Sequence, residues 1–224
     1  MLLQKDKKIL IYFFLFVVLG SINNKYFVDT KIFKIKDFKL DGLNEKEKLD
    51  LLLQFDQFKE QNIFYLSKDE IIKILDKNNL IDSFLINKNY PSNLNIKIEK
   101  TKFLANIDVN GKNYLIGSNK KLIQTESNNE SLPNIFGNPS LDDFFLIKNN
   151  ISKSSINFNN IKNLFFFPSN RWDLELKNGI LIKLPNVNSV DALNNYFKLI
   201  KLPEFQNVKV FDMRINKQII INEL

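Results

Sequence analysis

Apolar and polar residues alternate along some stretches of this chain and recur at helical spacing along others. Residues 32–40 alternate, which predicts a β-strand, and Asp41-Gly42 predicts the turn that ends it. Asn44 then stands three residues before Glu47, the spacing of a helix capping box, and leucines follow at helical intervals. The pattern therefore predicts a strand followed by a helix.

The same two patterns return before residue 102. Ser67 and Glu70 have capping-box spacing, and the apolar residues that follow fall on one helical face. Alternation then resumes over residues 84–88 and 94–98, on either side of Tyr90-Pro91, which predicts two strands joined by a turn. The predicted order over residues 31–101 is β-α-α-β-β, a three-stranded sheet with two helices on one face.

Strands predominate in the pattern from residue 102 to residue 224. Asn110-Gly111 is a hairpin signal, Ser140 is placed to cap a helix through Ile147, and Ser189 opens a further helix. The predicted strands are 103–109, 113–116, 121–124, 161–167, 172–177, 180–184, 208–215 and 218–222, with a polar loop at 127–131. We expect a mostly antiparallel β-domain with flanking helices.

The N-terminal segment is apolar over residues 9–22 and follows three lysines. This run is shorter than the ~20 residues that a spanning helix needs. One interpretation is a signal peptide with a cleavage site near Gly20. The other is an uncleaved transmembrane helix over residues 9–28, with residues 1–8 as a cytoplasmic tail. The segment alone does not decide between the two.

Composition narrows the possible functions. The 224 residues are 44% apolar and 25% charged, enough for a folded core, and include neither Cys nor His. Thiol nucleophiles, imidazole bases and the common zinc sites are thereby excluded. The net charge of +7 comes from scattered lysines, with only Arg171 and Arg214 as arginines, so we expect no nucleic-acid partner.

Three features are candidates for chemistry, and each has a simpler explanation. Ser118 to Lys121 fits S-x-x-K, but it falls in a predicted turn and the chain lacks the companion motifs of that enzyme class. Asp142 and Asp143 are neighbours in a predicted helix and point in different directions. The aromatic run 165–167 is typical of a buried strand. We therefore expect no catalytic residue, metal, cofactor or small-molecule substrate.

The order of the motifs resembles the FtsQ/DivIB family of cell division proteins, over nearly the whole chain. The residues that carry the resemblance are 38–42 (F-K-L-D-G), 63–68 (I-F-Y-L-S-K), 90–96 (Y-P-S-N-L-N-I), 98–100 (I-E-K), 132–137 (L-P-N-I-F-G), 172–180 (W-D-L-E-L-K-N-G-I) and 210–214 (V-F-D-M-R). Two positions depart from the family pattern. A proline that is common shortly after the pair at Glu99-Lys100 is missing, and Lys120 occupies a position where a turn glycine is frequent.

The resemblance implies an α+β protein with a single N-terminal transmembrane helix, a POTRA domain over residues 31–101 and a β-domain over residues 102–224. It implies an essential, non-enzymatic scaffold, with a single pass through the inner membrane and most of its chain in the periplasm. At the division septum it would link cytoplasmic and periplasmic components, and its POTRA domain would dock other division proteins. The alternatives are a POTRA-bearing outer-membrane assembly or secretion factor and a secreted periplasmic protein.

The last predicted strand, 218–222, stands at the end of the sequence, and we expect no later chain to cover it. Ile219, Ile220 and Ile221 are apolar on both faces of this strand, whereas an unpaired edge normally carries charges or prolines. By resemblance, the FtsB–FtsL pair adds a strand to this edge. The expected partner-binding residues are Arg214, Ile215, Lys217, Gln218, Ile219, Ile220 and Ile221. The alternative is an interior strand covered by a helix of its own domain.

Overall fold

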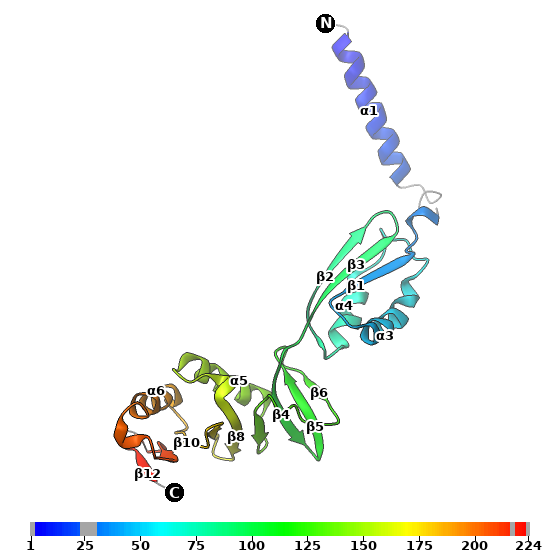
Figure 1. Ribbon diagram of the computed structural model, residues 1–224. Coiled ribbons are helices and arrows are strands. Elements are labelled where there is room, and N and C mark those ends of the chain that lie inside the picture. The colour runs from blue at the N-terminus through cyan, green and yellow to red at the C-terminus, as the bar shows by residue number, and fades with distance from the viewer. Residues whose placement is uncertain (1–2, 23–30, 216–217, 223–224) are drawn as a thin grey trace. The chain divides into compact units, whose positions relative to one another are not determined.

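The computed structural model describes residues 3–22, 31–215 and 218–222. The chain divides into two compact units, Met1–Lys100 and Thr101–Leu224 (Figure 1). Each unit has its own hydrophobic core. Below, these are called the N-terminal unit and the C-terminal unit.

The N-terminal helix α1 spans Leu3–Ile22. No helix in the described part of the chain is long and apolar enough to cross a membrane, so the expectation of a transmembrane helix over residues 9–28 is wrong. The reason lies in where α1 begins and ends. Its first two turns hold Lys5, Asp6, Lys7 and Lys8, which leaves an apolar stretch only from residue 9 onward. Residues 23–28 of the expected span lie outside the described residues.

The remaining elements of the N-terminal unit follow the order predicted from the sequence and make a POTRA-like sheet and helix pair. They are β1 (Asp37–Asp41), α3 (Glu45–Phe55), α4 (Lys68–Lys77), β2 (Ile81–Asn89) and β3 (Asn93–Lys100), with short 3-10 helices η1 (Lys31–Phe33) and η2 (Asp56–Phe58). The sheet order is β1-β3-β2, with β1 parallel and β2 antiparallel to the central β3. Among the described strands, both outer strands of this small sheet therefore have one edge without a strand partner.

Local signals at the helix starts explain most of this agreement. Asn44 and Glu47 form the predicted capping box, with a 2.9 Å bond from the Glu47 backbone N–H to the Asn44 side chain. Ser67 also caps its helix, but its hydroxyl accepts from the backbone N–H of Asp69 instead of Glu70. The first strand is shorter than expected because residues 31–33 form η1 and the strand begins only at Asp37.

Gly42 ends that strand in a way that no other residue could. Its φ of +101° lies in the left-handed region, and a Cβ at this position would stand 1.9 Å from the carbonyl oxygen of Ile98. The turn that leads into α3 therefore depends on glycine. The core of the unit is formed by side chains of the helices and of one sheet face, among them Leu51, Phe55, Ile71, Leu75, Leu94 and Ile96.

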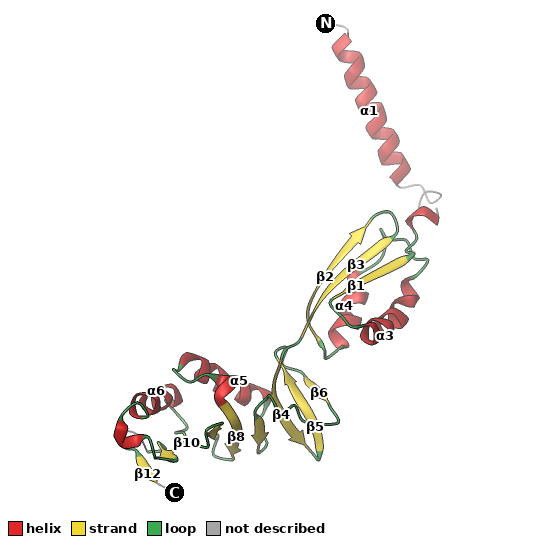
Figure 2. Cartoon of the chain, in the orientation of Figure 1, coloured by secondary structure: helices red, strands yellow, loops and turns green. Residues whose placement is uncertain are grey.

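The C-terminal unit is a long mixed sheet with two helices (Figure 2). Its strands are β4 (Phe103–Val109), β5 (Lys112–Gly117), β6 (Leu122–Gln124), β7 (Asn134–Phe136), β8 (Ile161–Phe167), β9 (Arg171–Leu176), β10 (Leu181–Lys183), β11 (Val210–Asp212) and β12 (Ile220–Asn222). The sheet order is β12-β11-β10-β9-β8-β7-β4-β5-β6. The helices are α5 (Leu141–Lys153) and α6 (Ser189–Leu199), with 3-10 helices η3 (Phe158–Asn160) and η4 (Pro203–Phe205).

Two features of this unit differ from the sequence-based prediction. Strand β7 was not predicted, yet it lies in the middle of the sheet, parallel to both β4 and β8. Helix α5 continues to Lys153 instead of ending near Ile147, and its cap is a full box in which the Asp143 side chain reaches back to Ser140. Three of the eight strand pairs are parallel, because β7 and β11 each join neighbours that are distant in sequence.

The two faces of the sheet around β9, β10 and β11 have opposite chemistry. Leu174, Ile182 and Phe211 are in register with one another and fully buried in the core, together with residues of α6 such as Leu193 and Tyr196. The next row of the same strands, on the opposite face, holds Asp173, Lys183 and Asp212. Burial of the apolar row fixes the register of the three strands, and this register brings Asp173, Lys183 and Asp212 side by side on the other face.

Candidate functional site

The strand β12 is the last strand of the sheet at one end and, among the described strands, pairs with β11 alone. Its register sets Ile220 opposite Asp212, Ile221 opposite Phe211 and Asn222 opposite Val210. Ile220 is 56% exposed, and Ile219 and Ile221 are about two-fifths exposed, at 40% and 42%. A sheet edge with two exposed isoleucines in its strand and a third directly before it is unusual, because native edges are normally protected by charge, proline or a bulge.

The hydrogen bonds of β11 determine which backbone groups of β12 face outward. The Met213 N–H donates to the carbonyl oxygen of Lys183, and the Leu181 N–H donates to that of Lys209. The odd-numbered residues of β11 therefore face β10, and its even-numbered residues face β12. With Asp212 opposite Ile220, the Ile220 backbone groups point toward β11. The N–H and C=O of Ile221 consequently point to the open edge.

The structure places most of the sequence-predicted binding residues together around this edge. Arg214 and Ile215 follow β11, Gln218 and Ile219 precede β12, and Ile220 and Ile221 lie within it. Lys217 lies outside the described residues. The strand itself is shorter than predicted, because it begins at Ile220 and not at Gln218, whose N–H instead donates to the Ile215 carbonyl oxygen at 3.1 Å.

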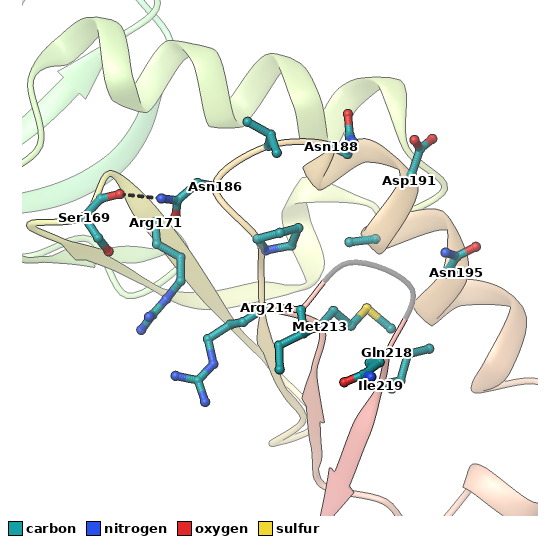
Figure 3. Close-up of a pocket in the computed structure, with 14 residues that line it drawn as sticks. Ser169, Arg171, Asn186, Asn188, Asp191, Asn195, Met213, Arg214, Gln218 and Ile219 are labelled. Carbon is teal, nitrogen blue, oxygen red and sulfur yellow. Dashed lines mark hydrogen bonds between the residues drawn. The ribbon is translucent and has the colours of Figure 1, made fainter.

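A groove of about 550 Å³ lies beside the edge, on the side of helix α6 (Figure 3). Its walls come from the turn between β8 and β9 with the start of β9, the segment after β10, the first turns of α6, and residues between β11 and β12. The lining residues are Ser169, Arg171, Pro185, Asn186, Val187, Asn188, Asp191, Ala192, Asn195, Met213, Arg214, Ile215, Gln218 and Ile219. Four of the seven predicted residues are therefore also groove residues.

The only two arginines of the chain line this groove. Figure 3 shows both side chains extending to the same side, away from Asp191 and Asn195. Arg214 is held by Asp212, to which its Nε donates at 2.8 Å, and Arg171 Nε donates to Asp173 at 3.1 Å. Each guanidinium keeps further N–H donors beyond these bonds. Cationic groups therefore stand next to the exposed apolar edge.

The two carboxyl groups that hold these arginines titrate differently. The hydrogen bond from Arg214 lowers the pKa of Asp212, although partial burial opposes the shift. Burial raises the pKa of Asp173, and the charge and hydrogen bond of Arg171 counteract part of that effect. Lys183 lies opposite both carboxylates, in β10. Lys183 thus lies between two carboxylates, whose charge is opposite to its own, and each carboxylate also accepts a hydrogen bond from an arginine.

Sequence reasoning missed Arg171 and the groove lining from α6. Register brings these residues together across strands far apart in sequence, which spacing alone cannot reveal. One signal was available, because arginine is rare in this lysine-rich chain, and Arg171 directly precedes a predicted strand while Arg214 lies within one.

The three features considered for catalysis each have a structural setting. Ser118 lies in the turn between β5 and β6, where its hydroxyl accepts from the Lys102 N–H and contacts Thr101. Asp143 belongs to the cap of α5. The run at residues 165–167 belongs only partly to the core. Phe166 packs against the hydrophobic core, whereas Phe165 stacks on the exposed Phe136. Among residues 3–22, 31–215 and 218–222, no group of three or more acidic side chains is placed to hold a metal ion.

Comparison with known proteins connects this architecture to cell division. Residues 105–214 match the family model described as cell division protein FtsQ/DivIB, C-terminal. A cell division protein FtsQ from Rickettsia bellii is 28% identical over 201 residues, covering 85% of this chain and 73% of that protein. The FtsQ of Rickettsia prowazekii is 27% identical, covering 86% and 74% respectively.

A solved structure is also similar, at 14% sequence identity and a TM-score of 0.35. It is the major extracytoplasmic domain of the division protein DivIB from Geobacillus stearothermophilus, and the match covers 49% of this chain and 98% of that domain. A score this low carries no argument about the fold, so the assignment rests on the family model and the Rickettsia relatives. The chain therefore resembles the FtsQ/DivIB family of cell division proteins, by the family model over residues 105–214 and by the Rickettsia relatives over most of its length.

Proposed function

We propose that this protein is a non-catalytic scaffold of the division machinery and that the open edge of β12 receives a strand from the FtsB–FtsL pair. The observation that carries the proposal is the exposure of Ile219, Ile220 and Ile221 at the end of the sheet. Strand addition satisfies outward-facing backbone groups and covers apolar side chains at the same time. The similarity to division proteins makes protein partners at the septum the natural occupants of such an edge.

The edge offers both affinity and selectivity for an extended segment. The N–H and C=O of Ile221 provide main-chain hydrogen bonds, as the register implies. Ile220 lies on the same face as Asp212 and the arginine beside it, whereas Ile221 lies on the face of Phe211 and α6. Alternate side chains of an added strand would therefore meet a charged surface on one face and an apolar one on the other.

The groove beside the edge extends this surface. Met213 is buried and Val187 is highly exposed, so the groove has an apolar floor and an apolar rim. Arg171 and Arg214 add cationic donors at one side. A partner chain that continues past the added strand would rest in this groove, with acidic residues toward the arginines.

The test uses substitutions at Ile221, whose N–H faces the open edge. Ile221→Pro removes that N–H, whereas Ile221→Ala removes only the side chain. Binding of the purified FtsB–FtsL pair should weaken roughly tenfold or more in the proline variant relative to the alanine variant, since a lost main-chain bond also disturbs its neighbours. Biolayer interferometry with each full-length variant gives the affinities, and circular dichroism with thermal melting verifies the fold.

The other edge of the same sheet supplies the control. In β6, the N–H of Thr125 and the C=O of Lys121 bond to β5, so the N–H of Gln124 faces away from β5. Gln124→Pro should leave FtsB–FtsL binding unchanged. If the folded Ile221→Pro variant binds as well as Ile221→Ala, strand addition at β12 is wrong.

A second part of the proposal concerns the N-terminal unit. We propose that it docks other division proteins through its sheet, because β1 and β2 each leave one edge without a partner among the described strands and Leu85 of β2 is exposed. Deleting residues 32–101 while keeping the C-terminal unit should abolish localisation to the division site. Fluorescence microscopy of the tagged deletion checks this, and normal septal localisation would contradict it.

A further inference from the structure

One end of the N-terminal unit gathers exposed aromatic rings from three separate segments, residues 31–36, 59–68 and 86–92. Main-chain bonds join the segments, since the Ile63 N–H donates to Phe33 and the Lys36 N–H donates to Ser92. Lys88 adds a side-chain bond of 3.0 Å to the carbonyl oxygen of Leu66. We call this region, made of the three segments, the aromatic end.

The rings of the aromatic end contact one another. Phe64 stacks on Tyr90, with 4.8 Å between centroids, and meets Phe33 edge to face at 5.1 Å. Phe64 is nevertheless 54% exposed, Tyr90 58% and Tyr65 66%, and the neighbouring Ile32 is 60% exposed. All four exposed residues stand on a 3-10 turn, a loop or a hairpin turn instead of a strand. The end is therefore a projecting apolar surface.

The aromatic end carries mostly positive charge. Its three segments contain six lysines and one acidic residue, Glu60, which pairs with Lys34 at 3.8 Å. Lys59 is paired with Asp56, outside the three segments. Lys68 and Lys88 lie close enough for Lys68 to contribute to the lowered pKa of Lys88, whose main cause is burial. Both ammonium groups are bonded to main-chain carbonyl oxygens of the aromatic end, Lys68 to Ile86 and Lys88 to Leu66.

We propose that the aromatic end docks on an anionic lipid surface. Tyrosine and phenylalanine rings favour the boundary between water and acyl chains, and lysine stems lie along apolar surface while their ammonium groups reach anionic headgroups. Each lysine near such a surface strengthens binding severalfold. A second copy of the same end is a poor partner, because both surfaces would be cationic. The inference involves neither the edge strand β12 nor helix α1.

The test needs a signal from the aromatic end itself. Trp172 is the only tryptophan of the chain, so Tyr65→Trp combined with Trp172→Phe places a single reporter on the aromatic end of the full-length protein. The probe is a vesicle of phosphatidylcholine with or without phosphatidylglycerol, with bromine atoms on the acyl chains. The emission at residue 65 should shift to the blue and be quenched by the anionic vesicles, and much less by the neutral ones.

Two pairs of lysine substitutions test the electrostatic part. Lys31→Gln with Lys36→Gln removes two exposed charges from the aromatic end and should weaken vesicle binding roughly tenfold or more. Lys46→Gln with Lys73→Gln removes two exposed charges from α3 and α4 and should have little effect. Equal weakening by the two pairs would mean that net charge alone drives binding, and would overturn the proposal.

Further outcomes are also decisive. Vesicle binding without quenching at residue 65, or equal quenching by neutral vesicles, contradicts the proposal. A blue shift that grows with protein concentration in the absence of vesicles assigns the surface to self-association and likewise overturns it. If Trp172→Phe does not fold, Trp172 is retained, and the quenching of the Tyr65→Trp protein is compared with that of the wild-type protein.

Discussion

The sheet of the C-terminal unit ends in two edge strands that differ in how they are protected. At one end, Leu122 and Ile123 of β6 are half-buried, and the chain continues from β6 back across β5 and β4 to β7. Asn106 holds this connecting segment between β6 and β7 in place. Its side chain accepts a hydrogen bond from the Asn129 N–H at 2.8 Å and donates one to the Asn129 carbonyl oxygen. At the other end, Ile219, Ile220 and Ile221 of the β12 edge are all exposed.

The difference teaches that position at the edge does not by itself make a binding surface. Both strands are short and both leave outward-facing backbone groups, but only the β12 edge also exposes three branched apolar side chains beside a groove. Apolar edges of this kind promote association unless a partner covers them. The predictions below test whether β12 is such a surface or simply a loosely held end.

The largest effect on stability is expected from a substitution in β11, measured against one at the facing position of β12. Phe211 is fully buried and lies in register with Ile221, which is partly exposed. Phe211→Ala should lower the free energy of unfolding by about 3–5 kcal/mol because it leaves a cavity in the core. Ile221→Ala should cost about 1 kcal/mol or less. Urea unfolding measures both, and similar losses would mean that β12 is an integral part of the core.

The protected end should depend on Asn106. This nearly fully buried amide bonds to Asn129, Leu132 and Asn134, so Asn106→Ala removes the partner of several part-buried polar groups. The expected loss of unfolding free energy is about 1–3 kcal/mol. Asn128→Ala, in the same segment but exposed, should change it by less than about 0.5 kcal/mol. Equal effects of the two substitutions would show that the Asn106 bonds do not hold the segment.

A smaller effect, visible only as a function of pH, is expected at Arg214. Its hydrogen bond lowers the pKa of Asp212 in the folded state. That stabilisation is therefore present above the ordinary aspartate pKa of about 3.9 and is lost as the pH falls through the lowered value. Arg214→Gln should flatten the acid side of a plot of melting temperature against pH. An unchanged profile would mean that the pair contributes nothing to stability.

The smallest effect on stability is expected from Ile220→Lys. The new cation would lie opposite Asp212 on an exposed position, so the free energy of unfolding should stay within about 0.5 kcal/mol of the wild-type value. FtsB–FtsL binding should nevertheless be lost, because a charge on an edge strand opposes pairing. Gln124→Lys on β6 is the matched control and should bind normally. Loss of fold in Ile220→Lys would indicate an interior strand.

The sequence predicted best where local chemistry determines local structure. Asn44 and Ser140 lie at the predicted helix starts, since a cap needs only the next few residues. Strand β7 was not predicted because three residues are too few to show an alternation of apolar and polar positions. Its strand conformation arises from parallel pairing with β4 and β8. The transmembrane expectation failed because the apolar run was extended past Ile22, where α1 ends, and the helix begins among charged residues.

The candidate site was predictable in part for the same reason. Three adjacent isoleucines in one predicted strand could be recognised from β-sheet physics as unusual for an edge, because such a strand is apolar on both faces. The groove could not, because Arg171 and Asp191 reach it from β9 and α6 only after the register of the sheet is set. The orientation of the Ile221 N–H is also a property of register and not of residue type.

Hydrogen exchange along β12 tests the central claim most directly. In the free protein the Ile221 amide, which faces the open edge, should exchange much faster than the Ile220 amide, which faces β11. Saturation with the FtsB–FtsL pair should slow exchange at Ile221 by roughly a hundredfold or more, as expected for a newly formed ladder bond. If Ile221 exchanges equally fast in the free and the saturated protein, while protection appears elsewhere, the partner does not add a strand to β12.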